Sequence, residues 1–454
     1  MTAKVNVDMT TRPLLKKIIL FTLPLIATAV LQLLYNAADI IVVGQFAGST
    51  AMAAVGSTTS LVHLITNLFI GFSVGTLSVM SRSVGANDYE YSKKIVHTSI
   101  LLSTLCGFAV GIIGLIFSQT FLIWMGSPEE VLPQSVLYLK IYFVGSPFLM
   151  LYNFGSAILR ACGDTKRPLI ILALSGILNV IINYVLVAWF DLGVIGVAVG
   201  TIVSQAASAI SVVCVLIKRK GFGQFSFKNL QINKTALIDI VRIGLPAGLQ
   251  STIFSISNVL IQSSINSFGD IAMAGSAAAA SIEGFVFVTM NSVTQACLTF
   301  VACNLGAKKT QNMRIVVYQC LMLTAIVGIV LGVGTYLFGR PLLSIYNSEE
   351  NVIEYGLERL SVISVSYALC GVMEIFVSGM RGMGYSSVPA VTSVAGVCGL
   401  RILWIYTVFS ARRSLYVLYL SYPVSWIITT LVHIVSYLIV RKKVEDRLKN
   451  EITQ

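Results

Sequence analysis

Long apolar segments alternate with short polar ones along the whole chain of 454 residues. Crossing the hydrocarbon core of a bilayer takes roughly 20 residues in a helix but only ~10 in a barrel strand, so runs of this length predict helices. We therefore predict an all-α integral membrane protein with twelve transmembrane helices. These helices are expected near 16–43, 51–80, 93–118, 135–159, 168–190, 194–217, 238–266, 274–303, 313–338, 355–379, 388–409 and 414–440.

The composition agrees with a chain whose main solvent and partner is the lipid bilayer. Apolar residues make up 56% of the sequence and charged residues 11%, whereas a soluble domain has roughly 45–50% and about 25%. The net charge of +12 comes from short basic clusters between apolar runs, so it does not indicate a nucleic-acid partner. The eight cysteines and three histidines show no metal-ligand spacing, and we expect no resident metal and no cofactor.

The distribution of positive charge predicts the orientation in the membrane. Loops on the same side as the N-terminus hold 25 of the 31 Lys and Arg residues. The alternate loops carry acidic residues instead, at Glu129, Glu130, Asp191, Asp270, Glu349 and Glu350. By the positive-inside rule we expect both termini on the cytoplasmic side of a plasma membrane, or of the inner membrane of a double-membraned cell.

The sequence also repeats itself at a fixed distance. The segment from Arg160 to Pro168 recurs from Arg381 to Pro389, an offset of 221 in the numbering, and the Gly-Ala pair at 85–86 recurs at 306–307 with the same offset. Pro24 and Pro246 are offset by 222, which fits after a one-residue insertion. Repeats of six spans are parallel, so we predict an N-terminal lobe at 1–217, a cytoplasmic connector at 218–235 and a C-terminal lobe at 236–454.

Taken in order, these motifs resemble the multidrug and toxic compound extrusion (MATE) family over nearly the full length. The match rests on Leu23-Pro24, on the segment from Asn36 through Asp39 to Gly44, on the Gly-Ala turns and on the paired arginine loops. The resemblance implies a monomeric antiporter that exports small, cationic or amphipathic drug-like compounds. Entry of H+ or Na+ would drive export by alternating access of the two lobes.

The same resemblance implies a cation-coupling site. DinF-type members carry an acidic residue in the first helix at the place of Asp39, and Asn179, Asn183 and Thr201 match its polar partners in the fifth and sixth helices. Na+ binding at Asp39 is one option. Asn183 stands where archaeal members have an aspartate, which counts against sodium. The NorM-type branch is less similar, because its glutamate position falls on Phe254.

Residue chemistry alone also directs attention to carboxylates inside predicted helices, because each costs roughly 2.5–3.5 kcal/mol on insertion scales. Asp39 shares a polar stripe with Tyr35 and Asn36, and Pro24 in the same helix provides a site for bending. Two interpretations of Asp39 remain. It is either a residue that couples ion entry to transport, or a carboxylate at a helix end that is hydrogen-bonded to its neighbours at the water boundary.

Further substrate or gating candidates lie in the remaining helices. Glu374 has Asn153 as its repeat mate, and the two would either line the path between the lobes or fix helix contacts. Glu283 has no polar mate in the first half, and Arg401 is the partner that the sequence offers for it, in a structural ion pair or in the substrate path.

Other functions are less well supported by the sequence. A lipid-linked saccharide or lipid flippase of related architecture is the main alternative to drug export, since fold alone does not fix function. No clustered catalytic residues indicate an enzyme. The chain has no Gly-Lys dipeptide, so a phosphate-binding loop of an ATP-driven pump is excluded.

Overall fold

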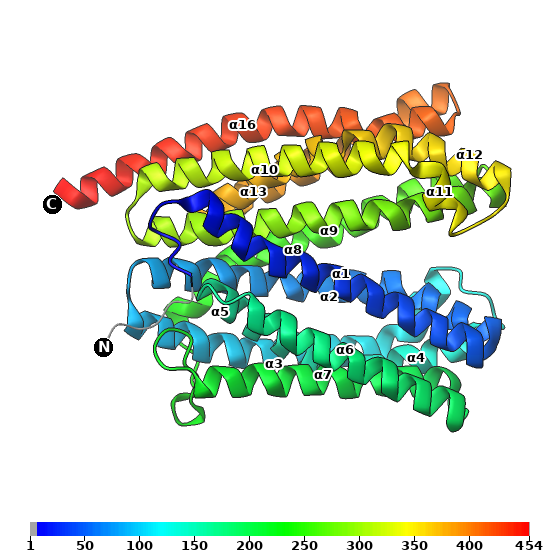
Figure 1. Ribbon diagram of the computed structural model, residues 1–454, viewed down its shortest axis with the longest axis horizontal. Coiled ribbons are helices and arrows are strands. Elements are labelled where there is room, and N and C mark those ends of the chain that lie inside the picture. The colour runs from blue at the N-terminus through cyan, green and yellow to red at the C-terminus, as the bar shows by residue number, and fades with distance from the viewer. Residues whose placement is uncertain (1–6, 454) are drawn as a thin grey trace. The chain divides into compact units, whose positions relative to one another are not determined.

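The computed structural model describes residues 7–453, and within that range the ordered elements are helices (Figure 1). In the first half these are α1 (Leu14–Phe46), α2 (Gly48–Gly85), α3 (Tyr89–Trp124), α4 (Leu132–Val144), α5 (Ser146–Ala161), α6 (Lys166–Tyr184), η1 (Val185–Trp189) and α7 (Gly193–Lys218). A short η2 (Phe227–Asn229) lies in the connector. The second half holds α8 (Lys234–Asn266), α9 (Asp270–Gly306), α10 (Thr310–Leu337), α11 (Gly339–Ser344), α12 (Glu350–Arg359), η3 (Leu360–Ser364), α13 (Val365–Gly382), α14 (Ser387–Ser393), η4 (Val394–Gly399), α15 (Leu400–Trp404), η5 (Ile405–Phe409) and α16 (Leu415–Thr453).

This element order confirms the predicted fold class. Within the described residues, eleven helical segments are long and apolar enough to cross a membrane, and a bent pair, α4 and α5 at 49°, makes a twelfth span. Each of the twelve predicted segments coincides with one of these spans. The chain is an all-α integral membrane protein.

The helices group into two compact units that do not follow chain order strictly. The first unit contains Leu23–Thr252 with Val7 and Asp8, and the second contains Met9–Thr22 and the chain from Ile253 onward. The opening turns of α1 therefore belong to the second unit, and the first half of α8 belongs to the first. The lobes proposed above by chain halves, 1–217 and 236–454, stay a prediction.

Turns at equivalent places in the two halves have the same geometry. Asn87 and Lys308 are related by the repeat offset of 221, and each has a φ of 56°, which is uncommon for a residue other than glycine. The loops after α5 and α13 also match: Gly163 and Gly384 have φ of 79° and 88°, and each donates its amide to an arginine carbonyl at 2.9 Å. The repeat seen in the sequence is thus a repeat of backbone structure.

Close helix contacts repeat with the same offset. A Cβ on Gly107 would lie 2.3 Å from the Pro147 backbone, and one on Gly328 would lie 2.7 Å from Ala368. Gly107 and Gly328 are separated by the repeat offset, and so are Pro147 and Ala368. These glycines allow the backbones of neighbouring spans to approach where any side chain would collide, as is common between membrane helices.

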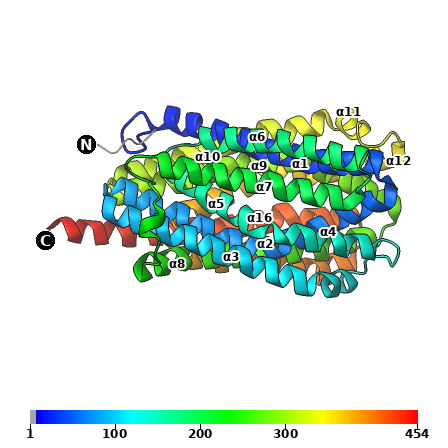
Figure 2. The same ribbon diagram turned by 90° about the horizontal axis from the view of Figure 1, so that it is seen from below.

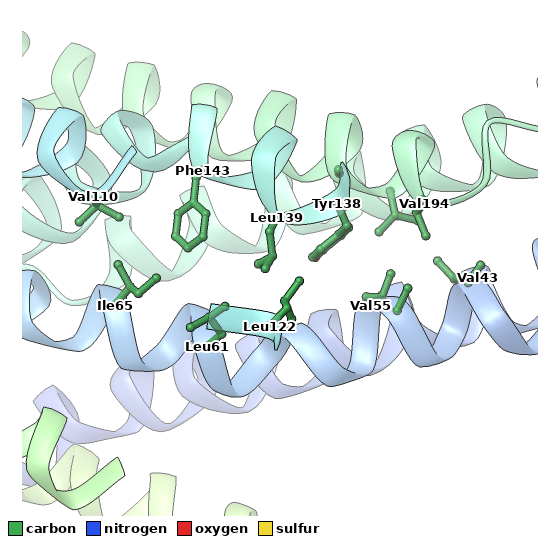
Figure 3. Close-up of a cluster of buried hydrophobic side chains, with 14 of the residues drawn as sticks. Val43, Val55, Leu61, Ile65, Val110, Leu122, Tyr138, Leu139, Phe143 and Val194 are labelled. Atoms are coloured by element: carbon green, nitrogen blue, oxygen red, sulfur yellow. The ribbon is translucent and has the colours of Figure 1, made fainter. Parts of the chain in front are cut away.

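The core of the first unit is apolar (Figure 3). Phe143 of α4 is fully buried and fills the space beside Gly114 of α3, where a Cβ would lie 2.1 Å from its ring. Side chains from α2, α3, α4 and α7 complete this cluster, among them Val55, Leu61, Ile65, Val110, Leu122, Tyr138, Leu139 and Val194. The cluster fixes α4 and α7, so the polar residues near them have a rigid support.

The connector packs onto the first unit. His97 of α3 lies within hydrogen-bonding distance of the Ser226 backbone, and the Asn233 amide donates to Thr98 Oγ1 at 2.9 Å. Arg219 is buried, donates to the Phe222 carbonyl at 2.7 Å and pairs with Asp164 at 3.4 Å. These bonds fix the path of the chain between α7 and α8.

Candidate functional site: a carboxylate between helices

The part of α1 that follows Thr22 runs along α6 (Figure 2). Asp39 lies at this contact, where it is hydrogen-bonded to α6. Asn183 of α6 donates from Nδ2 to Asp39 Oδ1 at 2.6 Å. The Thr201 hydroxyl of α7 is a second polar neighbour of this carboxylate, and it donates to the Val197 carbonyl oxygen at 2.9 Å. Three helices of the first unit therefore meet at one carboxylate.

Asn183 is completely buried, and its position depends on Gly200 having no side chain. A Cβ on Gly200 would lie 1.9 Å from Asn183 Oδ1, so only glycine leaves room for the amide there. Asn183 Nδ2 also lies 3.4 Å from Asn179 Oδ1, one turn earlier in α6. Asn183 Oδ1 is buried without a hydrogen-bond partner among the described residues, so it is free to accept a bond or to contact a cation.

Tyr35 makes a second contact between α1 and α6, one turn before Asp39. Its hydroxyl donates to the carbonyl oxygens of Leu172 and Ala173 at 3.2 and 3.1 Å. Its ring lies against Gly176, where a Cβ would be 1.7 Å from the ring. Tyr35 and Asp39 together tie this part of α1 to α6.

Asp39 has no basic partner among the described residues; its polar neighbours are the Asn183 amide and the Thr201 hydroxyl. A partly buried carboxylate without a positive partner is costly in a low-dielectric medium, and a proton or a cation relieves that cost. The oxygen atoms of Asp39, Asn179, Asn183 and Thr201 are the type of ligand that hard cations prefer. The cluster can therefore hold a proton or a small cation.

Two other residues of α1 lie apart from this cluster. Asn36 is exposed and makes no side-chain hydrogen bond with the described residues. Pro24 lies inside the helix, two residues after Thr22, the last residue of α1 that belongs to the second unit, and its carbonyl accepts from Thr28 Oγ1 at 2.7 Å. Pro24 cannot donate an amide bond to the preceding turn, so the helix is weakened at this point.

The pairing of Glu283 with Arg401 suggested by the sequence is wrong. Glu283 of α9 is bound by Arg359, the last residue of α12, through Nε at 3.1 Å and Nη2 at 2.8 Å. Arg359 Nη1 also donates to Ser276 at 2.9 Å. The pair is buried and ties α9 to α12, so its geometry is that of a helix-fixing ion pair.

The remaining candidates are dispersed. Arg401 of α15 donates from Nε to Ser425 Oγ at 3.1 Å. Glu374 of α13 is partly buried and interacts electrostatically with Arg381. Asn153 of α5 donates to the Leu149 carbonyl of its own helix at 2.9 Å. A meeting of Asn153 and Glu374 near a substrate path stays a prediction.

Twelve apolar spans in two repeated halves, with polar groups held between helices, define a multi-pass membrane transporter rather than an enzyme. The MatE family model matches residues 24–185 and again residues 246–407. The chain therefore belongs to the MatE family, as its resemblance to MATE proteins implied. Its placement closer to the DinF-type branch than to the NorM-type branch stays a prediction.

Individual relatives match over most of their length. The "Probable multidrug resistance protein YoeA" of Bacillus subtilis is 30% identical over 434 residues, which cover 93% of each chain. "Multidrug export protein MepA" of Staphylococcus aureus is 25% identical over 394 residues, or 87% of each chain. The crystal structure of the Vibrio cholerae MATE transporter VcmN in the bent form has a TM-score of 0.86 at 22% identity and covers 95% of this chain and 97% of its own. That likeness concerns the fold.

Proposed function

We propose that the chain is a secondary active antiporter, which exports small cationic or amphipathic drug-like compounds in exchange for H+ or Na+. The observation that carries this proposal is the Asp39 cluster, a carboxylate inside a membrane helix whose polar neighbours among the described residues are an amide and a hydroxyl. An intramembrane carboxylate of this kind marks an ion or proton pathway in transporters. The names of the relatives YoeA and MepA support drug-like compounds as the cargo.

Coupling requires that the ion interact differently with two states of the protein. When Asp39 is ionised, the Asn183 amide donates to it, and the Thr201 hydroxyl can turn to donate as well. When Asp39 is protonated or holds a cation, its attraction for these donors falls. The contact between α1 and α6 therefore depends on occupancy, and Pro24, earlier in the same helix, gives α1 a place to bend in response. This bend would couple ion entry to alternating access.

The proposal is tested by efflux of a cationic dye from proteoliposomes, under a Na+ gradient and, separately, under a pH gradient. We expect one of the two gradients to drive efflux in the wild type. Asp39→Asn keeps the shape of the side chain but cannot cycle between charged and neutral forms, so it should reconstitute normally and lose gradient-driven efflux. Asp191→Asn is the matched control: this exposed loop residue has a φ of 52°, which asparagine tolerates.

Three results would contradict the proposal. Wild-type efflux by Asp39→Asn, together with loss of efflux in Glu374→Gln, would place coupling in the second unit. ATP-dependent dye uptake that survives an uncoupler would rule out an ion gradient as the energy source. Movement of a lipid-linked saccharide, with no dye transport under either gradient, would favour the flippase.

A further inference from the structure

Arg401 is a buried cation in the second unit whose contacts are with aromatic and small polar side chains. It is 5% exposed. The guanidinium lies 3.9 Å from the centre of the Tyr422 ring and 5.6 Å from that of Trp426. Ser425 accepts from Arg401 Nε at 3.1 Å and donates its own proton to the Tyr422 carbonyl at 2.9 Å. These contacts hold the guanidinium in one orientation.

No carboxylate lies within ion-pair distance of Arg401 among the described residues. The titratable side chains near it are Tyr422, Tyr367, Cys370 and Cys398, and none of them is a carboxylate. The terminal Nη groups make no hydrogen bond with the described side chains or backbone. Because a buried charge needs a counter-charge, the protein alone leaves this site incomplete.

The backbone before Arg401 differs from that of the first half. The π-helical turn η4 lies just before α15, whereas α6 continues as α-helix at the equivalent place in the first copy.

The offset of 222 that joins Pro24 to Pro246 in the first helices of the two halves pairs Asp39 with Ile261. Ile261 is buried in the apolar core of the second unit. The second half therefore has no carboxylate at the position equivalent to Asp39.

We propose that Arg401, with Tyr422 and Trp426, forms an anion site that binds the carboxylate group of an aromatic, zwitterionic compound. A guanidinium binds a carboxylate through two parallel hydrogen bonds, and both Nη groups are available for this. The rings beside it offer surfaces for the aromatic part of the ligand. This inference rests on the proposed function and specifies part of the substrate class. A carboxylate on the substrate would supply the negative charge that is absent beside Arg401.

The test measures equilibrium binding to the purified full-length protein in detergent, with no gradient. The probes are a fluorescent xanthene dye with a free carboxylate and the methyl ester of the same dye, which is a plain cation. We expect the wild type to bind the acid more tightly than the ester. Arg401→Gln should weaken binding of the acid roughly tenfold and change binding of the ester less than about twofold, since a charge-assisted hydrogen bond is lost for the acid alone.

Two further measurements keep the proposal falsifiable if Arg401→Gln folds poorly. Benzoate should displace the acid, but not the ester, from the wild type. Arg401→Lys keeps the positive charge and should retain part of the preference for the acid. Equal binding of acid and ester to the wild type, or equal weakening of both by Arg401→Gln, would show a packing role and overturn the proposal.

A lipid phosphate is the competing source of negative charge. Displacement of the acid by phosphatidylglycerol but not by benzoate would assign the site to a lipid headgroup and also overturn the proposal. Because binding is measured without a gradient, it can succeed or fail independently of ion-coupled export. A protein that exports dye but binds acid and ester equally would refute the anion site and leave the proposed function standing.

Discussion

Asn183 and Asp39, which are 144 positions apart in the chain, share a hydrogen bond of 2.6 Å between α6 and α1. The bond joins the helix that carries the proposed coupling carboxylate to its neighbour. Changing the Asn183 side chain therefore changes the chemistry of the site without touching the carboxylate itself.

Asn183→Asp should increase the dependence of efflux on sodium. Two carboxylates at this separation cannot both stay ionised unless a proton or cation lies between them, and the variant gives a cation a second charged ligand. We expect the apparent affinity for Na+ to rise on the order of tenfold. The measurement is dye efflux as a function of Na+ concentration, with the exposed Asn229→Asp as control. An unchanged Na+ response in a well-folded variant would separate Asn183 from ion binding.

Gly200→Ala should impair efflux through Asn183. The new Cβ would lie 1.9 Å from Asn183 Oδ1, so the amide must move and its bond to Asp39 must lengthen or break. We expect efflux to fall roughly tenfold, because the loss of one charge-assisted hydrogen bond corresponds to an effect of about that size. Gly56→Ala is the control, because a Cβ there meets nothing within 4 Å. If both variants transport equally, the contact of Gly200 with Asn183 has no role in coupling.

Glu283→Gln should destabilise the protein strongly, because it leaves Arg359 buried beside a neutral group. Removing one partner of a buried ion pair typically costs about 3–5 kcal/mol. The readout is the midpoint of thermal unfolding in detergent. The double variant Glu283→Leu with Arg359→Met removes both charges and should recover much of the loss. A double variant less stable than Glu283→Gln would contradict an ion pair whose main effect is mutual neutralisation.

Gly75→Ala should loosen the packing of α2 against the first half of α8. Its Cβ would lie 2.2 Å from the Ile240 carbonyl oxygen, and one on Gly71 would lie 2.3 Å from the Gly248 backbone. Overpacking of this kind costs about 1–3 kcal/mol. We expect a lower unfolding midpoint for Gly75→Ala and an unchanged midpoint for Gly284→Ala, where a Cβ meets nothing within 4 Å. Equal unfolding midpoints for the two variants would mean that α2 and α8 can move apart at little cost, and would contradict a tight contact at Gly75.

The predicted orientation is tested by cysteine labelling. Cysteines at Glu129 and Glu349 should react with an impermeant reagent in intact cells, whereas cysteines at Lys220 and Lys308 should react only after permeabilisation. All four positions are exposed, so access depends on the side of the membrane. The exposed native cysteine, Cys214, must first be replaced by serine. Equal labelling of all four in intact cells would overturn the orientation.

Hydrophobic periodicity was sufficient to predict the twelve spans, because a bilayer requires long apolar helices and leaves few alternatives. The repeat was also visible in the sequence. The structure shows that it extends to the backbone, because turns such as those at Asn87 and Lys308 have the same geometry. The neighbours of Asp39 came from family resemblance. The structure brings Asn179, Asn183 and Thr201 to it, and their role in coupling stays a prediction.

The charge pairing of the second half was not predictable in the same way. Sequence shows which helices carry charges but not which helices touch, so it offered Arg401 as the partner of Glu283 and did not indicate Arg359. Arg359 lies at the end of α12, directly before the π-helical η3, and hydropathy gives no sign of that break.

The grouping of Met9–Thr22 with the second unit has a consequence for synthesis. Asn304 Nδ2 donates to the Met9 carbonyl across 295 positions, and Asn312 Nδ2 donates to the Thr10 carbonyl across 302. At roughly 5–20 residues per second, the ribosome makes these partners about 15–60 s after the segment they bind. During that interval the start of α1 is without its native neighbours, so an insertion factor that shields it should speed assembly of the whole chain.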